Sequence, residues 1–557
     1  MTTLEAYFRL LSVLDTLEQM PNIRFGSIVP EKPEASLQTM LEWIKICETT
    51  HIACKPFKEP QLPRRVIDVQ NWQNSLHPIR LYEGQGECSR YVALSHRWGS
   101  NQLLKTTTSS LESRKKAISW IELSQTFQDA IILTAKLGVR YLWIDSLCII
   151  QDSKKDWQQE SSKMASIYEN AFVTLAANRS EDDSKGGLFA PRVTNAATIQ
   201  VDFPGRPTIS VLVREALKHD QFYEGSENNE RHGSYPLFQR AWCFQERILA
   251  TRILHFTKNE VVFECKTGCK CECTSIGLRG DPFIKAYYQE LFAGKYYVNS
   301  WAGWRTVVTD YSKNRLTDSR DVLPALSGIS SRLQCEELGH FYAGLWEKEL
   351  IHGLFWYTRV STAFSTPIYT GPSFSWVSLI GRADFKDLQW TDSYKGSSDT
   401  RVPNVGLINV TCWVNGSNPY GEVSKGIVEL RARCHDVILI QHPGKRHPKM
   451  QVIWKSDPTS PFWDTDDIRE SRTSTDHVFL DCGNISAETV GGQQLTCIIG
   501  FWKNYKGNFL IKTGTGLVLE KLPHDLLYRR VGYFEGLPYP GGLLESRYGS
   551  EKIIKIS

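Results

Sequence analysis

The sequence has no apolar stretch that approaches the ~20 residues needed to span a membrane. Its first twenty residues are interrupted by charges, and they lack the basic start and the unbroken apolar run of a signal peptide. The 14 cysteines are scattered over 557 residues, whereas a secreted disulfide scaffold concentrates them in a short chain. These absences predict a cytoplasmic protein that does not enter a membrane.

A strong charge of one sign is also missing. The formal net charge is only +4 and no basic cluster stands out, so we expect neither nucleic acid nor a membrane surface as a partner. The sequence has no internal repeat, no Ser in a Gly-x-Ser-x-Gly elbow, and no phosphate-binding Gly loop between a strand and a helix. Because these patterns are absent, they do not identify the chemistry, and no cofactor is predicted.

What the sequence does contain is an alternation of strand-like and helix-like segments. Three short apolar runs, RYVALSHRWG (90–99), VRYLWID (139–145) and AFVTLAA (171–177), have the length and composition of buried strands. Helical patterns separate them. Strands that alternate with helices over such lengths predict βαβ units and a mainly parallel sheet, so the fold class is α/β.

The helices between these strands carry boundary signals. Ser124 can cap the first helix, and Gly138 would end it. Ser153 followed three residues later by Asp156 is a capping-box signal for a second helix, which we expect to run to about Asn170. Further on, residues 236–252 are predicted to form a helix.

The remaining pattern divides the chain into four regions. Residues 1–75 form an N-terminal helical segment with Pro-rich connections, and residues 76–275 form the α/β core, which ends in a hairpin. Residues 276–370 are predicted to be helical, including FYAGLWEKELIHGLFWY. From 371 to 557, β-branched and aromatic runs broken by turn residues predict a β-rich region.

Glu160 is a carboxylate on a helix face that should be buried. The face follows helical spacing through Trp157, Glu160, Met164, Ile167, Tyr168 and Ala171. An unpaired buried carboxylate costs several kcal/mol, so Glu160 must be paired or must lie at the edge of a cavity. A structural ion pair with Arg97 or Arg240 is one alternative, and a functional pocket is the other.

Other polar residues are expected at the same place. His96 and Arg97 close the first strand, Asp145 closes the second, and Cys148 and Gln151 follow it. The carboxyl ends of parallel strands meet at one edge, which is where open α/β sheets bind ligands. Each residue also has an ordinary structural alternative, such as a loop histidine, a helix cap or a small core thiol.

The helix predicted over 236–252 adds further polar groups, because Gln245 lies on its apolar stripe. Gln245 and Arg240 could instead only satisfy backbone groups. We therefore predict one polar pocket at the sheet edge. The predicted catalytic residues are Glu160, His96 and Asp145. The predicted binding residues are Arg97, Trp98, Cys148, Gln151, Trp157, Arg240, Trp242, Gln245 and Glu246.

Four cysteines stand close together in CKTGCKCEC, at Cys265, Cys269, Cys271 and Cys273. A zinc site usually consists of two separated pairs with two to four residues inside each pair. The spacing here is irregular and no His lies within it. The sequence alone therefore predicts no metal site.

Three long motifs resemble those of the fungal heterokaryon incompatibility (HET) domain. They are YVALSHRWG, RYLWIDSLCIIQDSKKDWQQESSKMASIYENAFVTLAA and RAWCFQERILATRILHF. DSRDVLPALSGIS, YAGLWEKEL and PSFSWVSLIG resemble segments that follow this domain in many such proteins, so the resemblance covers roughly residues 80–380. It implies a fungal source and a role in nonself recognition and programmed cell death, without fixing a chemistry.

HET domains are in turn similar to TIR domains in proposed fold. TIR enzymes that cleave NAD carry a Trp-x-x-Glu on the helix after a central strand, and Trp157 and Glu160 resemble that pattern. Gln158 stands where the pattern prefers Cys. In those enzymes the carboxylate stabilises the cation formed at the ribose as nicotinamide leaves.

Three functions therefore remain open, and with them the question of whether the chain is an enzyme. The first is a nonself-recognition and cell-death effector that cleaves NAD or a related nucleotide. The second is an enzyme of fungal secondary metabolism that cyclises, isomerises or hydrolyses an organic intermediate. The third is an interaction module without turnover. The expected partners are a small-molecule or nucleotide ligand and a protein that binds the C-terminal region.

Overall fold

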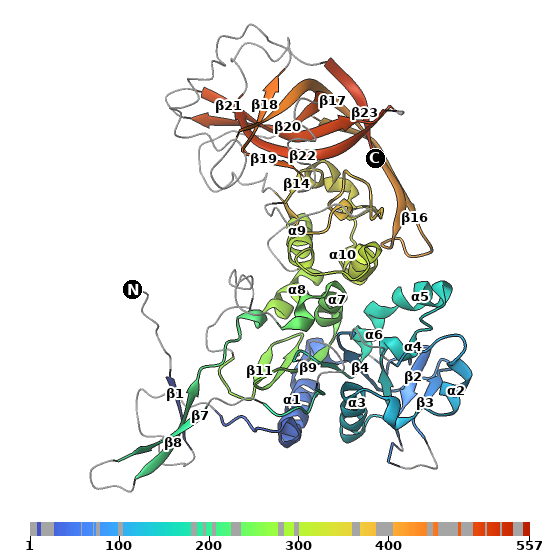
Figure 1. The fold of residues 1–557 in the computed structure, drawn as a ribbon, viewed down its shortest axis with the longest axis vertical. Helices are drawn as coiled ribbons and strands as arrows, with labels where there is room; N and C mark the ends of the chain where they lie inside the picture. The colour runs from blue at the N-terminus through green and yellow to red at the C-terminus, as the bar shows by residue number, and fades with distance from the viewer. Residues whose placement is uncertain are drawn as a thin grey trace. The chain divides into compact units, whose positions relative to one another are not determined.

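The computed structural model divides into two compact units, residues 1–296 and residues 297–557, which are described separately (Figure 1). It describes residues 8–12, 27–56, 58–70, 72–73, 78–98, 104–179, 186–192, 196–202, 208–223, 235–276, 283–294, 300–358, 368–385, 405–442, 449–454, 477–480, 494–506, 510–523, 526–538 and 550–557. Within these residues no helix combines the length and the apolar character needed to cross a bilayer.

The first unit is built around an eight-stranded sheet with the order β11-β10-β9-β6-β4-β5-β2-β3. Its strands are β2 (Arg65–Asp68), β3 (Arg80–Glu83), β4 (Tyr91–Ser95), β5 (Tyr141–Trp143), β6 (Val173–Ala176), β9 (Arg252–Phe256), β10 (Val261–Cys265) and β11 (Cys269–Cys271). The central strands β9, β6, β4 and β5 are parallel, and antiparallel strands extend the sheet on both sides. The predicted α/β class is confirmed, with the parallel pairs at the centre.

Helices cover both faces of this sheet. The helices of the unit are α1 (Leu37–Thr50), α2 (Leu111–Lys116), α3 (Gln125–Lys136), α4 (Asp145–Cys148), α5 (Lys154–Ser161), α6 (Met164–Asn170), α7 (Ala241–Leu249) and α8 (Ile284–Phe292). The chain leaves β4 for β5 through α3, then returns past β4 to β6 through α4 to α6. Right-handed crossovers in opposite directions place α3 on one face and α6, with α7 beside it, on the other (Figure 1).

The predicted helix boundaries rest on capping chemistry that the structure confirms. The Ser124 hydroxyl accepts a hydrogen bond from the Phe127 backbone N–H at 3.3 Å, and the Ser153 hydroxyl accepts one from Asp156 at 3.3 Å. Gly138 follows α3 with a φ of +72°, a backbone conformation that glycine adopts without strain.

The second of these helices differs from its prediction, because α5 and α6 are separate. Ser161 donates to the carbonyl of Gln158 at 3.3 Å, and Ser162 donates to that of Gln159 at 2.8 Å. Lys163 N–H then bonds to the Glu160 carbonyl in a tighter turn. Serine side chains that bond to nearby carbonyls compete with the helical ladder, which explains the break.

Residues 236–252 also form two helical pieces instead of one. A 3-10 turn, η7 (Pro236–Gln239), is joined to α7 through Arg240, whose backbone is extended. The following hairpin agrees with its prediction, since β9 and β10 pair antiparallel around Lys258 and Asn259.

The N-terminal segment, expected to be helical, contains α1 but is not helical throughout the residues that the structure describes. Residues Phe8–Ser12 form strand β1, which pairs with β8 (Ile209–Glu215), and β8 pairs with β7 (Ala196–Val201). Pairing with a distant strand overrides the local pattern here. Residues 1–7 and 13–26 lie outside the described residues.

The helical part of the second unit comprises α9 (Ser300–Tyr311), α10 (Ser327–Leu333) and the short α11 (Leu350–Gly353). The segment expected to be helical at 341–346 is instead a hairpin of β12 (Phe341–Tyr342) and β13 (Leu345–Trp346). Ala343 and Gly344 both have positive φ, at +48° and +92°, as a two-residue hairpin turn requires. Two further short strands, β14 (Trp356–Tyr357) and β15 (Asp384–Phe385), pair with each other.

The C-terminal region is β-rich, as predicted. Its eight strands are β16 (Val405–Val414), β17 (Val423–His442), β18 (Lys449–Trp454), β19 (His477–Leu480), β20 (Gln494–Lys506), β21 (Leu510–Lys521), β22 (Leu527–Pro538) and β23 (Ser550–Ile556). They form one sheet in which β22 and β23 pair parallel and the other pairs are antiparallel.

Candidate functional site

The connections of the first sheet reverse direction at β4. The chain moves from β4 to β5 on one side and then to β6 on the other. The connections therefore leave β4 and its neighbour β6 in opposite directions, and the switch point lies at the carboxyl ends of these two strands. Open α/β sheets bind ligands at such places. The polar residues around the carboxyl end of β4 are therefore the candidate site.

Asp145 is held at this edge by three neighbours. Its Oδ2 accepts a hydrogen bond from the Trp98 indole N–H at 2.8 Å, and its Oδ1 accepts one from the Ser146 backbone N–H at 2.7 Å. His96 Nε2 lies 3.7 Å from Oδ1. The carboxylate keeps 21% of its side-chain surface exposed and Trp98 keeps 38%, so a ligand can reach both.

His96 is buried and fixed on two sides. Its ring meets Phe127 edge-on at 5.1 Å between centroids. Its backbone carbonyl accepts a hydrogen bond from Arg240 at 3.0 Å. The predicted residues His96, Asp145, Trp98 and Arg240 are thus brought together, while the side chain of Arg97 is exposed.

Glu246 lies on the buried face of α7, next to Ser95 at the end of β4. The Ser95 hydroxyl donates a hydrogen bond to its carboxylate. Burial raises the pKa of Glu246 to about 7, and the negative charge of Asp145 adds to the rise, while Ser95 and Arg240 oppose it. A carboxyl group with this pKa can accept and return a proton near neutral pH.

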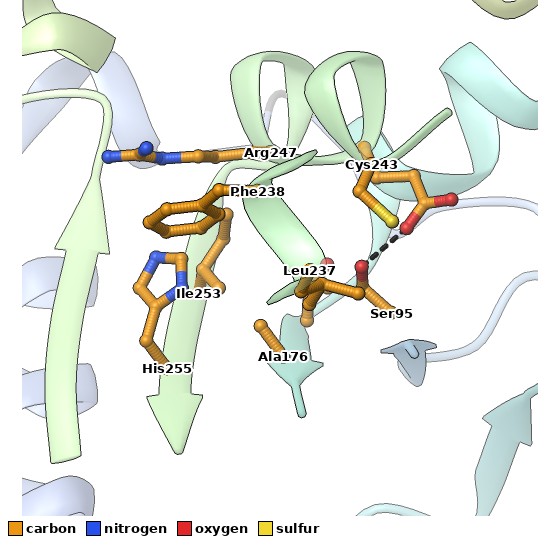
Figure 2. A pocket seen from close by; sticks show the side chains of 10 residues that line it. Ser95, Ala176, Leu237, Phe238, Cys243, Arg247, Ile253 and His255 are labelled. Atoms are coloured by element: carbon orange, nitrogen blue, oxygen red, sulfur yellow. Dashed lines mark hydrogen bonds between the residues drawn. The ribbon is translucent and has the colours of Figure 1, made fainter. Parts of the chain in front are cut away.

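A small cavity opens beside this carboxyl group. Figure 2 shows Ser95 and Cys243 on one side and the Phe238 ring between Arg247 and His255 on the other. The volume that the centre of a water molecule can occupy in this cavity is about 10 Å³, so the cavity has room for one water. The cavity is too small for an organic substrate, so a ligand at this edge would have to contact the exposed Asp145 and Trp98 instead.

Glu160 is buried, as its place on the helix stripe predicted, with 2% exposure. It forms an ion pair with Lys163, whose Nζ lies 3.4 Å from Oε1, because residues three apart are neighbours on a helix. Beside it, Trp157 meets Trp242 edge-on at 6.4 Å between centroids. Glu160 does not line the cavity next to Glu246.

The other predicted residues have structural contacts. Burial raises the pKa of the Cys148 thiol to about 12, and the charges of Asp145 and Glu160 add to the rise. The Gln151 amide donates to the backbone carbonyls of Asp145 and Ile149 at 3.1 and 3.0 Å. Gln245 is buried in α7.

Comparison with protein families finds a domain match in this part of the chain. Residues 91–246 match the family model described as Heterokaryon incompatibility protein (HET). The chain carries a HET domain. Comparison with curated proteins and with solved structures finds no match.

The HET match begins at the first residue of β4 and ends at Glu246, so it contains every residue predicted for the site. Two residues of the HET domain that the sequence analysis missed also belong here. Ser95 bonds to Glu246, and Tyr168 donates to the Leu94 carbonyl at 3.1 Å. Burial raises the pKa of Tyr168, and the charges of Glu246 and Asp145 add to the rise.

A charged network beneath the cavity was also missed. Arg247 makes two hydrogen bonds to Glu264, at 2.9 and 2.8 Å, and Glu264 bonds to His255 at 3.0 Å. Burial lowers the pKa of His255 to about 4, so the ring is neutral at pH 7. His255 and Glu264 lie on β9 and β10, beyond the HET match. His255 pairs with Val262, so Glu264, two residues further along β10, lies on the same face of the hairpin, which the strand spacing could have indicated.

Proposed function

We propose that this chain is a nonself-recognition and cell-death effector whose HET domain cleaves NAD or a related nucleotide. The observation that carries the proposal is the group formed by Asp145, Trp98 and His96 at the carboxyl edge of β4 and β5. It combines a partly exposed carboxylate with an exposed aromatic ring. The HET match supports the cellular role.

The chemistry follows from what cleavage of a nicotinamide glycoside needs. The bond between ribose C1′ and the nicotinamide nitrogen breaks, and its electron pair leaves with nicotinamide. A carboxylate nearby stabilises the oxocarbenium-like cation that remains. Asp145 suits this role, because it is fixed by two hydrogen bonds and is open to a ligand. Trp98 offers a ring on which a base can stack.

Water then forms a bond to C1′ and must lose a proton. Glu246 can take this proton, since its pKa of about 7 leaves it partly ionised at neutral pH, and the cavity beside it accommodates one water. Glu160, which resembles the TIR carboxylate, does not line this cavity, and in this proposal it makes no direct contact with the reacting water.

The second candidate is an enzyme of fungal secondary metabolism. The raised pKa of Glu246 favours it as well, because cyclisation and isomerisation also need a group that exchanges protons near pH 7. Such an enzyme would use the same pocket but would spare NAD and would not harm its host.

Expression in a fungal host separates these functions. We expect induction of the wild type to deplete NAD and arrest growth, and induction of Asp145→Asn to do neither at equal protein level. Glu112→Gln is a matched control, because Glu112 is an exposed carboxylate on α2 in the same unit. Arrest without loss of NAD would reject the nucleotide chemistry, and normal growth with the wild type would reject the effector role.

A further inference from the structure

Four ligand-type side chains converge outside the HET match, where α1 meets the end of β10. They are Cys47, His51, Cys54 and Cys265, whose sulfur and nitrogen atoms all lie within 4.8 Å of one another. The three thiols are buried and His51 is partly buried. Three cysteines and one histidine form one of the common ligand sets of structural zinc.

Local structure aims these residues at one point. Cys47 lies in the last turn of α1, His51 caps that helix, and Cys54 ends the 3-10 turn η3 (Ile52–Cys54). Cys265 is the last residue of β10. Helix α1 packs against this strand, and the ring centroids of Trp43 and Phe263 lie 6.3 Å apart. The chain thus provides three ligands within eight residues and takes the fourth from a distant strand.

The spacing of the atoms suits a tetrahedral ion. With Zn–S near 2.3 Å and Zn–N near 2.0–2.1 Å, neighbouring ligands in a tetrahedron lie about 3.6–3.8 Å apart. The Sγ of Cys265 lies 3.3 Å from His51 Nδ1. No separation exceeds 4.8 Å, so each is at most about 1 Å longer than the tetrahedral value, an excess that small side-chain rotations can remove.

The surroundings supply a second, independent indication, because a buried cation lies next to the thiols and would stabilise their ionised form. Arg252 is buried, and its Nε donates to Cys47 Sγ at 3.3 Å. Among the described residues, no carboxylate forms an ion pair with Arg252; its other donors meet the carbonyls of Cys54 and Phe172. Three thiolates and one neutral imidazole around Zn²⁺ carry one net negative charge, which would balance the buried guanidinium.

A backbone donor completes this shell. The Thr267 N–H points at Cys265 Sγ at 3.4 Å. Donors that bond to ligand atoms fix and tune metal sites. We propose that Cys47, His51, Cys54 and Cys265 bind one structural zinc ion, which fastens α1 to the β10 end of the sheet.

A second cluster nearby has a different character. His219, Glu260, Cys271 and Cys273 also lie close together. His219 Nε2, however, bonds directly to Glu260 at 2.7 Å, and the other oxygen of Glu260 accepts the Cys273 N–H at 2.8 Å. Hydrogen bonds account for this arrangement, so the proposal concerns the first cluster alone.

Metal analysis of the purified chain, expressed with zinc in the medium, tests the proposal. We expect Cys265→Ser and His51→Ala each to contain about one zinc less per chain than the wild type. Cys88→Ser is the matched control, because Cys88 is an exposed thiol of the same unit, and it should keep the wild-type content. The comparison with the wild type makes the result independent of any metal at the second cluster.

His51→Ala guards against a folding failure, because His51 is partly exposed and its loss disturbs the core least. Cobalt added to the metal-free protein should give the d–d bands of tetrahedral cobalt and a thiolate charge-transfer band, both lost in His51→Ala. Equal zinc in the wild type and both variants would overturn the proposal. So would a disulfide between two cysteines of the cluster in protein purified with zinc present, located by mass spectrometry of its peptides.

Discussion

At the scale of single residues, Glu246 is the group whose position costs stability. Its pKa is about 7 in the folded protein, against 4.5 for a solvent-exposed glutamate, so folding favours the protonated form. Below pH 4.5 the carboxyl group is protonated in both states and its burial costs no ionisation energy. The free energy of unfolding then falls as the pH rises from 4.5 through 7, because the unfolded chain can ionise the group more easily. A site that keeps such a group against this cost is typical of function.

We therefore expect Glu246→Gln to stabilise the chain at pH 8 by up to ~3 kcal/mol relative to the wild type, because the amide has no charge to bury. At pH 4.5 the gain should vanish, since the wild-type carboxyl is then protonated. Urea unfolding at both pH values measures the difference. A gain of equal size at both would mean that packing, not ionisation, sets the effect.

Glu160 permits a similar separation of charge from shape. If Glu160 acts in catalysis, Glu160→Gln should lower turnover by roughly 10²–10⁴-fold while the fold stays intact, because Gln keeps the shape of Glu and loses only the charge. Lys163→Gln is the control, since it removes the partner that lies 3.4 Å from the carboxylate. Full activity in a well-folded Glu160→Gln would remove Glu160 from the mechanism, and a large fall in melting temperature would make it a structural charge.

At the scale of secondary structure, the sequence predicted the features that depend on neighbouring residues. Ser124, Gly138 and Ser153 marked helix ends correctly, since each cap bonds within a few residues. The break after Ser161 was missed, because serine is tolerated within helices and only its hydrogen bonds reveal the competition.

Distant contacts could not be predicted in the same way. Ser95 and Glu246 are 151 residues apart, and no periodic pattern connects them before the sheet order is known. The same holds for Cys265 and the cysteines of α1 and η3. The sequence placed Glu160 on a buried face correctly, and the i,i+3 spacing to Lys163 could have indicated the cation that the structure pairs with it.

Gly138 tests the helix boundary of α3 directly. Its φ of +72° suits glycine, and nothing lies within 4 Å of an added Cβ, so a substitution meets only backbone strain. Gly138→Ala should destabilise the chain by about 1 kcal/mol. Gly138→Asn should cost less, because asparagine tolerates this conformation. Equal losses for both variants in urea unfolding would contradict the backbone argument.

At the scale of the whole molecule, the chain divides after Tyr296, and both the candidate site and the proposed zinc ligands belong to the first unit. Each unit has its own sheet and its own buried aromatic residues. Units of this kind can unfold separately.

Calorimetry should therefore show two transitions. Removal of zinc with a strong chelator should lower only the transition of the first unit, because the metal stabilises only the part that binds it. The His51→Ala variant serves as the control, since the chelator should leave its transitions unchanged. A single transition that shifts as a whole would contradict the division into independent units.

We propose that the HET domain, residues 91–246, carries a nucleotide-cleaving site at the carboxyl edge of β4. The most direct measurement is nicotinamide release from NAD by the purified chain, compared between the wild type and Asp145→Asn, with a melting curve for each. We predict release by the wild type and a loss of about 10²–10³-fold in a folded Asp145→Asn, because the carboxylate stabilises the cation formed at the ribose. Equal release by both proteins, or none by the wild type, would contradict it.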